Sequence, residues 1–127
     1  MTIEERAARA VELKAGCNCA QAVVLSYADK LLLEEETLKK LAAGYGGGMG
    51  CMEGTCGALV GAVMAAGMLT DGQGTGRYAR EILLGFRERC GATICKDLKG
   101  VETGKVLCPC TECVRNAVLA AGAALGE

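Results

Sequence analysis

Nine cysteines are the residues of this 127-residue sequence best suited to chemistry. Histidine is absent, which excludes Cys–His nucleophilic pairs, Ser–His–Asp triads and every metal site that needs an imidazole. Any bound metal must therefore rest on thiolates or carboxylates. The odd number of cysteines also argues against a simple framework of disulfides.

Four of these cysteines share one kind of position, the first turn of a predicted helix: Cys19, Cys56, Cys95 and Cys110. Asn18, Thr55 and Thr93 are expected to cap the first three of these helices, because their side chains can accept a hydrogen bond from a free backbone amide of the first turn. Pro109 precedes the fourth cysteine and suits a helix start. Free amides and the helix dipole favour negative charge, so thiols there should ionise more readily than a free cysteine. If the four helix starts meet, they form a four-thiolate site.

The other cysteines leave several interpretations open. Cys113 forms a CxxC pair with Cys110, which is a moderate indication of redox or metal chemistry. The extra cysteines are resolving thiols, further ligands or simple neighbours of the four: Cys17, Cys51, Cys90 and Cys108. Cysteine is also small and apolar, so tight packing is an alternative role for any of them. The methionines at 49, 52, 64 and 68 are expected to fill the core rather than to bind metal.

The elements that position these thiols are predicted to be helices. Helices are expected from residue 3 to a stop at Gly16, and over 19–32, 34–43, 56–69 and 75–90. A short turn over 94–98 and a last helix from about 108 follow, and a glycine-rich turn spans 44–54. The apolar residues recur at helical spacing and no strand-like alternation is present. The sequence thus predicts one all-α, bundle-like domain of five or six helices over residues 1–127.

Small residues recur every four positions in the 56–69 helix, at Gly57, Gly61 and Ala65. A face without side chains allows a neighbouring helix to approach closely. It would serve equally for packing within the chain or for a homodimer contact.

Composition narrows the possible partners. Lys plus Arg is 14 and Asp plus Glu is 15, with no basic tract, so nucleic acid is not an expected partner. The longest apolar run, 58–69, is too short to span a bilayer. The charged N-terminus does not resemble a signal peptide, and we expect a cytoplasmic protein with reduced thiols. The glycine clusters contain neither GxGxxG nor GxxxxGK[ST], so they predict no nucleotide site.

Several of these segments together resemble a family of small redox-active proteins named for a C…GCAxxG…C…C pattern. The matching segments are NCAQAV at 18–23, GGGMG at 46–50, CGALVG at 56–61, Ile94-Cys95, and Cys110 ahead of VRNA at 114–117. The resemblance implies an all-α fold and four characteristic cysteines, which carry over to Cys19, Cys56, Cys95 and either Cys110 or Cys113. A related module accompanies split-Soret cytochrome c, where it is associated with an iron–sulfur centre.

We therefore expect a cytoplasmic redox protein whose four helix-start cysteines bind an iron–sulfur cluster, most simply [2Fe–2S], for electron transfer with a partner protein. A second hypothesis is a metal-free thiol–disulfide protein, with Cys56 as the attacking thiolate and Cys51 or Cys19 as the resolving thiol. A third is a structural zinc site or a plain helical interaction module. The sequence names no electron donor, acceptor or substrate, and it leaves open whether the protein is an enzyme.

Overall fold

A computed structural model describes residues 1–127 as seven α-helices without a strand. The helices are α1 (Ile3–Leu13), α2 (Cys19–Ser26), α3 (Glu35–Ala42), α4 (Gly57–Leu69), α5 (Thr75–Cys90), α6 (Cys95–Lys99) and α7 (Cys110–Leu125). A 3₁₀ turn, η1 (Ala43–Tyr45), and a π turn, η2 (Gly48–Met52), lie between α3 and α4. The predicted all-α class is confirmed. The expected five or six helices were too few, because the segment at 95–99 closes a helical turn of its own, with the Leu98 amide donating to the Ile94 carbonyl over 3.1 Å.

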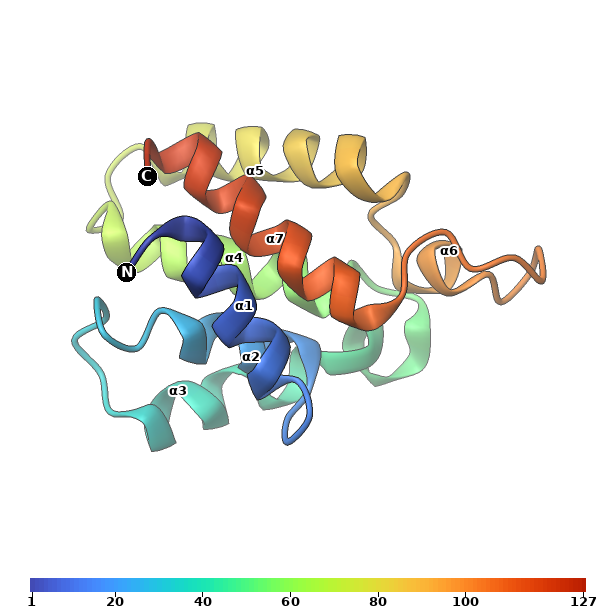
Figure 1. Cartoon of the computed structure of the whole chain (residues 1–127), viewed down its shortest axis with the longest axis horizontal. Helices are drawn as coiled ribbons and strands as arrows, with labels where there is room; N and C mark the ends of the chain where they lie inside the picture. The colour runs from blue at the N-terminus through green and yellow to red at the C-terminus, as the bar shows by residue number, and fades with distance from the viewer.

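The helices surround a core made largely of alanine, with buried cysteine, valine and leucine side chains among them. α2 packs on α4, α7 contacts α1, α4 and α5, and α3 covers the far side of α2. Figure 1 shows that α2, α4 and α7 all begin at the end of the molecule that carries α6, while both chain termini lie at the other end. No helix of the protein is long and apolar enough to cross a membrane.

The small-residue face of α4 is used inside the chain. A Cβ on Gly61 would lie 2.8 Å from the Ala20 carbonyl oxygen, and a Cβ on Gly57 would lie 2.6 Å from the Tyr45 carbonyl oxygen. These distances are shorter than real Cβ contacts, so the backbones approach this closely only because both residues are glycine. The expected close helix packing is confirmed, and α2 of the same chain covers the face that a homodimer contact would have used.

The end of α2 was predicted too late in the chain. The helix ends at Ser26 rather than near Leu32, which is 92% exposed. Arg6 of α1 explains the early end, because its guanidinium donates to the Ser26 carbonyl over 2.5 Å and also binds Asp29 in the turn that follows. The chain then turns at Tyr27 instead of continuing the helix.

The expectation that methionines fill the core was wrong for much of the set. Met49 is 58% exposed and Met68 is 41% exposed, while Met52 and Met64 are half-buried. Met49 and Met52 have φ values of 66°, in the left-handed region, because they lie in the tight turn of η2. The turn leaves Met49 exposed and Met52 only half-buried.

Candidate metal centre

One cavity brings together the four cysteines that the sequence places at helix starts. Its volume is about 180 Å³, and its lining includes Cys19, Cys56, Cys95 and Cys110. Cys19, Cys95 and Cys110 are the first residues of α2, α6 and α7, and Cys56 is the N-cap of α4. The other lining residues are Lys14, Asn18, Gly47, Gly57 and Lys99. Thiols separated by up to 91 positions in the sequence therefore share one site.

Two backbone hydrogen bonds join the segment that contains Cys56 to the segment that contains Cys95. Thr55 and Ile94 form an isolated antiparallel bridge. The Cys56 amide donates to the Thr93 carbonyl over 2.8 Å, and the Cys95 amide donates to the Gly54 carbonyl over 3.0 Å. Both cysteines begin their helices directly after this bridge, so the bridge sets the start of α4 beside the start of α6.

The glycine-rich turn packs against the same site. A Cβ on Gly48 would lie 2.5 Å from the Cys95 Cβ, and a Cβ on Gly46 would lie 2.4 Å from Cγ of Asn18. Gly48 also has a φ of 59°, which favours glycine. Asn18 caps α2, since its side chain accepts from the Gln21 backbone amide over 2.9 Å and its own backbone amide donates to the Gln21 side-chain oxygen. The turn thus holds the starts of both α2 and α6 in place.

The expected caps were confirmed for one of three helices. Asn18 forms a full capping box on α2. Thr55 and Thr93 make no side-chain cap, because they lie one residue too early and their backbones are engaged at the Thr55–Ile94 bridge. Cys56 and Ile94 occupy the N-cap positions instead, so the amides at the start of α4 have no hydroxyl partner.

The pKa of the Cys56 thiol is raised, contrary to the expectation of easy ionisation. The neighbouring Cys113 thiol and burial raise this pKa, and they outweigh the amides of Ala58 and Leu59, which lower it. Burial, with Cys110 and Cys56 nearby, raises the pKa of Cys19 to about 12. Burial raises the pKa of Cys95 as well, although Lys99 opposes it. Helix-start amides therefore lower the pKa of Cys56 as expected, but the neighbouring thiol and burial raise it by more.

The charged groups at the cavity are all cationic. Lys14 and Lys99 line it, and no carboxylate does. Burial alone would lower the pKa of Lys99, but the Cys113 and Cys110 sulfurs outweigh burial and raise it. Two ammonium groups beside four sulfurs suit a negatively charged occupant.

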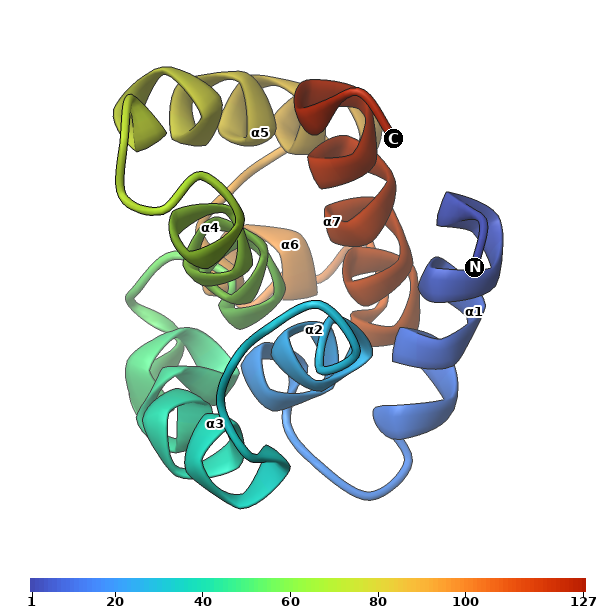
Figure 2. The same cartoon turned by 90° about the vertical axis from the view of Figure 1, so that its left-hand side faces the viewer.

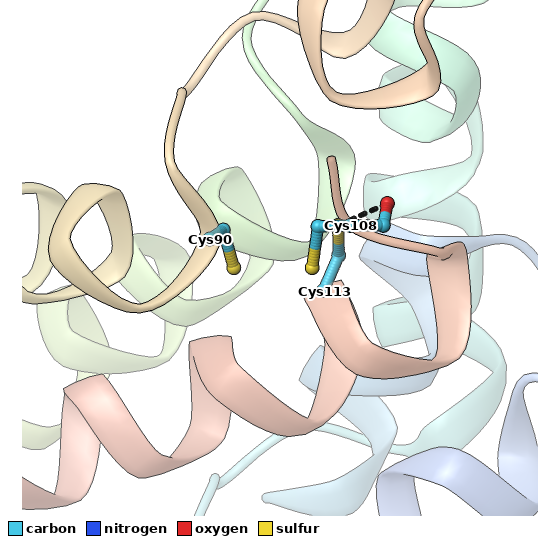
Figure 3. Close-up of side chains that lie close together, drawn as sticks. All are labelled: Cys90, Cys108 and Cys113. Carbon is cyan, nitrogen blue, oxygen red and sulfur yellow. Dashed lines mark hydrogen bonds between the residues drawn. The ribbon is translucent and has the colours of Figure 1, made fainter. Parts of the chain in front are cut away.

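A second group of cysteines lies beside the first. The sulfurs of Cys90, Cys108 and Cys113 are all within 4.8 Å of one another, and all three residues are buried. Figure 3 shows them coming from the end of α5, from the segment before α7 and from the first turn of α7. The Cys113 thiol donates to the Cys108 carbonyl over 3.4 Å. This buried triad can hold a metal ion through three sulfurs.

Comparison with known proteins gives the family. The family model described as "Putative redox-active protein (C_GCAxxG_C_C)" matches residues 17–123, a range that contains all nine cysteines. The chain belongs to this family. The resemblance inferred from the cysteine pattern is confirmed. Searches of curated proteins and of solved structures found no match.

The structure shows which cysteines line the cavity, which belong to the triad and which belong to neither, an assignment that the sequence left open. Cys110 lines the cavity with the characteristic set, whereas Cys113 is fully buried in the triad. Cys51 is exposed on η2, and Cys17 is half-buried with its thiol donating to the Leu13 carbonyl over 3.0 Å. Neither Cys17 nor Cys51 lines the cavity or belongs to the triad.

The triad is the feature that sequence reasoning missed. Cys90 and Cys108 were left as extra cysteines without a common role. The only signal in the sequence was their position at the two ends of the segment that carries α6, next to Cys113. The fold of that segment closes the loop and brings both ends together.

Proposed function

We propose that this protein binds an iron–sulfur cluster, most simply [2Fe–2S], in the cavity formed by Cys19, Cys56, Cys95 and Cys110, and exchanges electrons with a partner protein. The convergence of these four thiols on one cavity is the observation that carries the proposal. Four thiolates are the usual ligands of such clusters. When bound, the cluster would supply one-electron redox chemistry.

The donor set fits this occupant. All four donors are sulfur, no carboxylate or imidazole competes for the site, and the cavity volume of about 180 Å³ is far above the roughly 10–15 Å³ that one water needs. Lys14 and Lys99 would offset the negative charge of a thiolate-ligated cluster. Cys19, Cys56 and Cys95 are at most 7% exposed, so the surrounding chain would shield the site from water.

The metal-free thiol–disulfide hypothesis receives less support. Attack on a disulfide requires a thiolate, and the pKa values of Cys56 and Cys19 are both raised. Cys51, one of the two proposed resolving thiols, is outside the cavity lining. Zinc would accept the same four thiolates, so the metal itself must be identified by experiment.

Metal analysis of protein purified without oxygen tests the proposal. We expect a coloured protein with about two iron and two sulfide per chain, as the cluster type requires. Alanine substitution of Cys19, Cys56, Cys95 or Cys110 should each remove most of the iron, whereas Cys17→Ala and Cys51→Ala should retain it. A colourless, iron-free protein after reconstitution with iron and sulfide would contradict the proposal, and stoichiometric zinc would favour the structural alternative.

A further inference from the structure

We propose that Cys90, Cys108 and Cys113 form a second metal site, beside the cavity, that binds one thiophilic ion, copper(I), through three thiolates. The inference is independent of the proposed cluster, since the two sets of ligands share no residue. It begins from the geometry of the triad, whose sulfurs lie within 4.8 Å of one another.

Sulfurs at this separation suit a single ion. Metal–sulfur bonds of about 2.3 Å place three ligands about 4 Å apart around one centre. The triad therefore needs only a small contraction to bind. The relative exposures are 4% for Cys90, 4% for Cys108 and 0% for Cys113, so bulk water has little access to a bound ion.

Nitrogen donors already point at two of the three sulfurs. Nδ2 of Asn116 donates to Sγ of Cys90 over 3.5 Å, and Nζ of Lys99 donates to Sγ of Cys113 over 3.4 Å. A neutral thiol gains little from such donors, whereas a metal-bound thiolate accepts them strongly. Nζ of Lys99 also donates to the Cys108 carbonyl over 2.9 Å, which fixes the ammonium beside the triad.

The number of ligands favours copper(I) over zinc. Structural zinc is almost always tetrahedral with four protein ligands, and no fourth His, Cys, Asp or Glu joins the triad within its 4.8 Å limit. Copper(I) is stable with three sulfur ligands, and soft thiolates select it. Binding would exchange the three thiol protons for the ion, releasing the protons to solvent without any change of oxidation state. Lys99 would offset part of the resulting negative charge.

Two sets of variants separate this site from the cavity. Cys19→Ala/Cys110→Ala disables the cavity and leaves the triad intact. Cys90→Ala, Cys108→Ala and Cys113→Ala each remove one ligand of the triad. Each is made alone for iron analysis and in the Cys19→Ala/Cys110→Ala background for copper(I) titration, because the four cavity thiols would otherwise bind copper(I) as well. Cys108 lies in the segment before α7 rather than in a helix, so Cys108→Ala remains informative if a helical variant fails to fold. Cys17→Ala is the control, and circular dichroism checks the fold of each protein.

The measurement is anaerobic titration of metal-free protein with copper(I), in competition with a chromophoric copper(I) chelator, and a parallel titration with zinc. We expect the cavity variant, with or without Cys17→Ala, to bind one tight copper(I) equivalent, and a triad substitution in the same background to weaken it about tenfold or more. Equal copper(I) affinity after a triad substitution in the folded cavity variant, absence of a tight site in the cavity variant, or tight binding of zinc alone would each overturn the proposal. Iron and sulfide content of the triad variants reports on the cluster separately, so either proposal can fail without the other.

Discussion

Lys99 and Cys113 form a contact that links the two groups of cysteines. Nζ of Lys99 lies 3.4 Å from Sγ of Cys113, while the same lysine lines the cavity of Cys19, Cys56, Cys95 and Cys110. One ammonium therefore lies between the cavity and the triad. This position results from the single turn of α6, which begins at Cys95 and ends at Lys99.

Lys99→Met should weaken metal binding at both sites. Methionine keeps the apolar stem but removes the charge and the donors, and loss of such supporting contacts costs about 10–100-fold in metal affinity. Removing a nearby positive charge should also lower the reduction potential of a bound cluster, because the reduced state is the more negative one. Metal content and a redox titration measure the two effects. Lys105→Met, at an exposed position, is the matched control, and identical values for the two variants would refute the role of Lys99.

Gly48→Ala should disturb the cavity, because the new Cβ would lie 2.5 Å from the Cys95 Cβ. Gly50→Ala is a close control, since Gly50 also has a left-handed φ, 77°, but no atom lies within 4 Å of the added Cβ. Both variants should lose roughly 1–2 kcal/mol of unfolding free energy from backbone strain. Only Gly48→Ala should also lose iron. Urea unfolding and iron analysis on the same samples distinguish strain from displacement of Cys95, and equal iron loss in both would argue against our interpretation.

Gly61→Ala should separate α2 from α4. The added Cβ would lie 2.8 Å from the Ala20 carbonyl oxygen, which belongs to the backbone and cannot rotate away. We expect a loss of about 1–3 kcal/mol in unfolding free energy, as for other overpacked cores. Gly67→Ala in the same helix meets only Thr75 Cγ2 at 4.0 Å and should gain stability from helix propensity. Chemical denaturation that ranked the two variants in the opposite order would show that the helix contact is less tight than described.

Asp29 should make the stability of the protein sensitive to acid. Arg6 is 2% exposed, and its guanidinium donates to both carboxylate oxygens of Asp29 over 2.5 and 3.0 Å. This hydrogen bonding holds the pKa of Asp29 below its ordinary value. A carboxyl group with a depressed folded-state pKa stabilises the fold above its unfolded pKa of about 3.9, and this contribution is lost as the pH falls through the folded value.

Asp29→Asn should remove that dependence and leave the buried guanidinium with only the Ser26 carbonyl as a strong acceptor. We expect a loss of about 1–3 kcal/mol at pH 7. The difference between variant and wild type should shrink below pH 4. Glu36→Gln breaks an exposed pair with Lys40 at 4.0 Å and should change little. Urea midpoints measured from pH 7 down to pH 3 on metal-free protein test this, and a constant difference across the range would rule out the titration of Asp29 as its source.

Local sequence signals predicted most of the helices and the helix-start positions of the cysteines that line the cavity. Asn18 capped α2, and helical periodicity located six helices. These features depend on neighbours within a few residues, so one stretch of sequence is sufficient to recognise them. The cysteines at helix starts were recognisable for the same reason, and the family pattern selected three that line the cavity, Cys19, Cys56 and Cys95, with Cys110 and Cys113 as alternatives for the fourth.

Features that depend on distant partners were not predictable from local signals. The early end of α2 depends on Arg6, which lies 20 residues before the Ser26 carbonyl that it binds. The failure of Thr55 and Thr93 as caps depends on the bridge between Thr55 and Ile94. The raised pKa of Cys56 depends on burial and on Cys113, so a rule based on the helix end alone gave the wrong direction.

The sequence by itself determined an all-helical chain, thiol rather than imidazole chemistry, and the cysteines placed to share a site. Only the tertiary structure decided that Cys110 rather than Cys113 lines the cavity, and that Cys113 instead joins Cys90 and Cys108. The physical reason is that helix formation responds to nearby residues, whereas the meeting of three sulfurs depends on how α5, α6 and α7 pack, to which the whole core contributes.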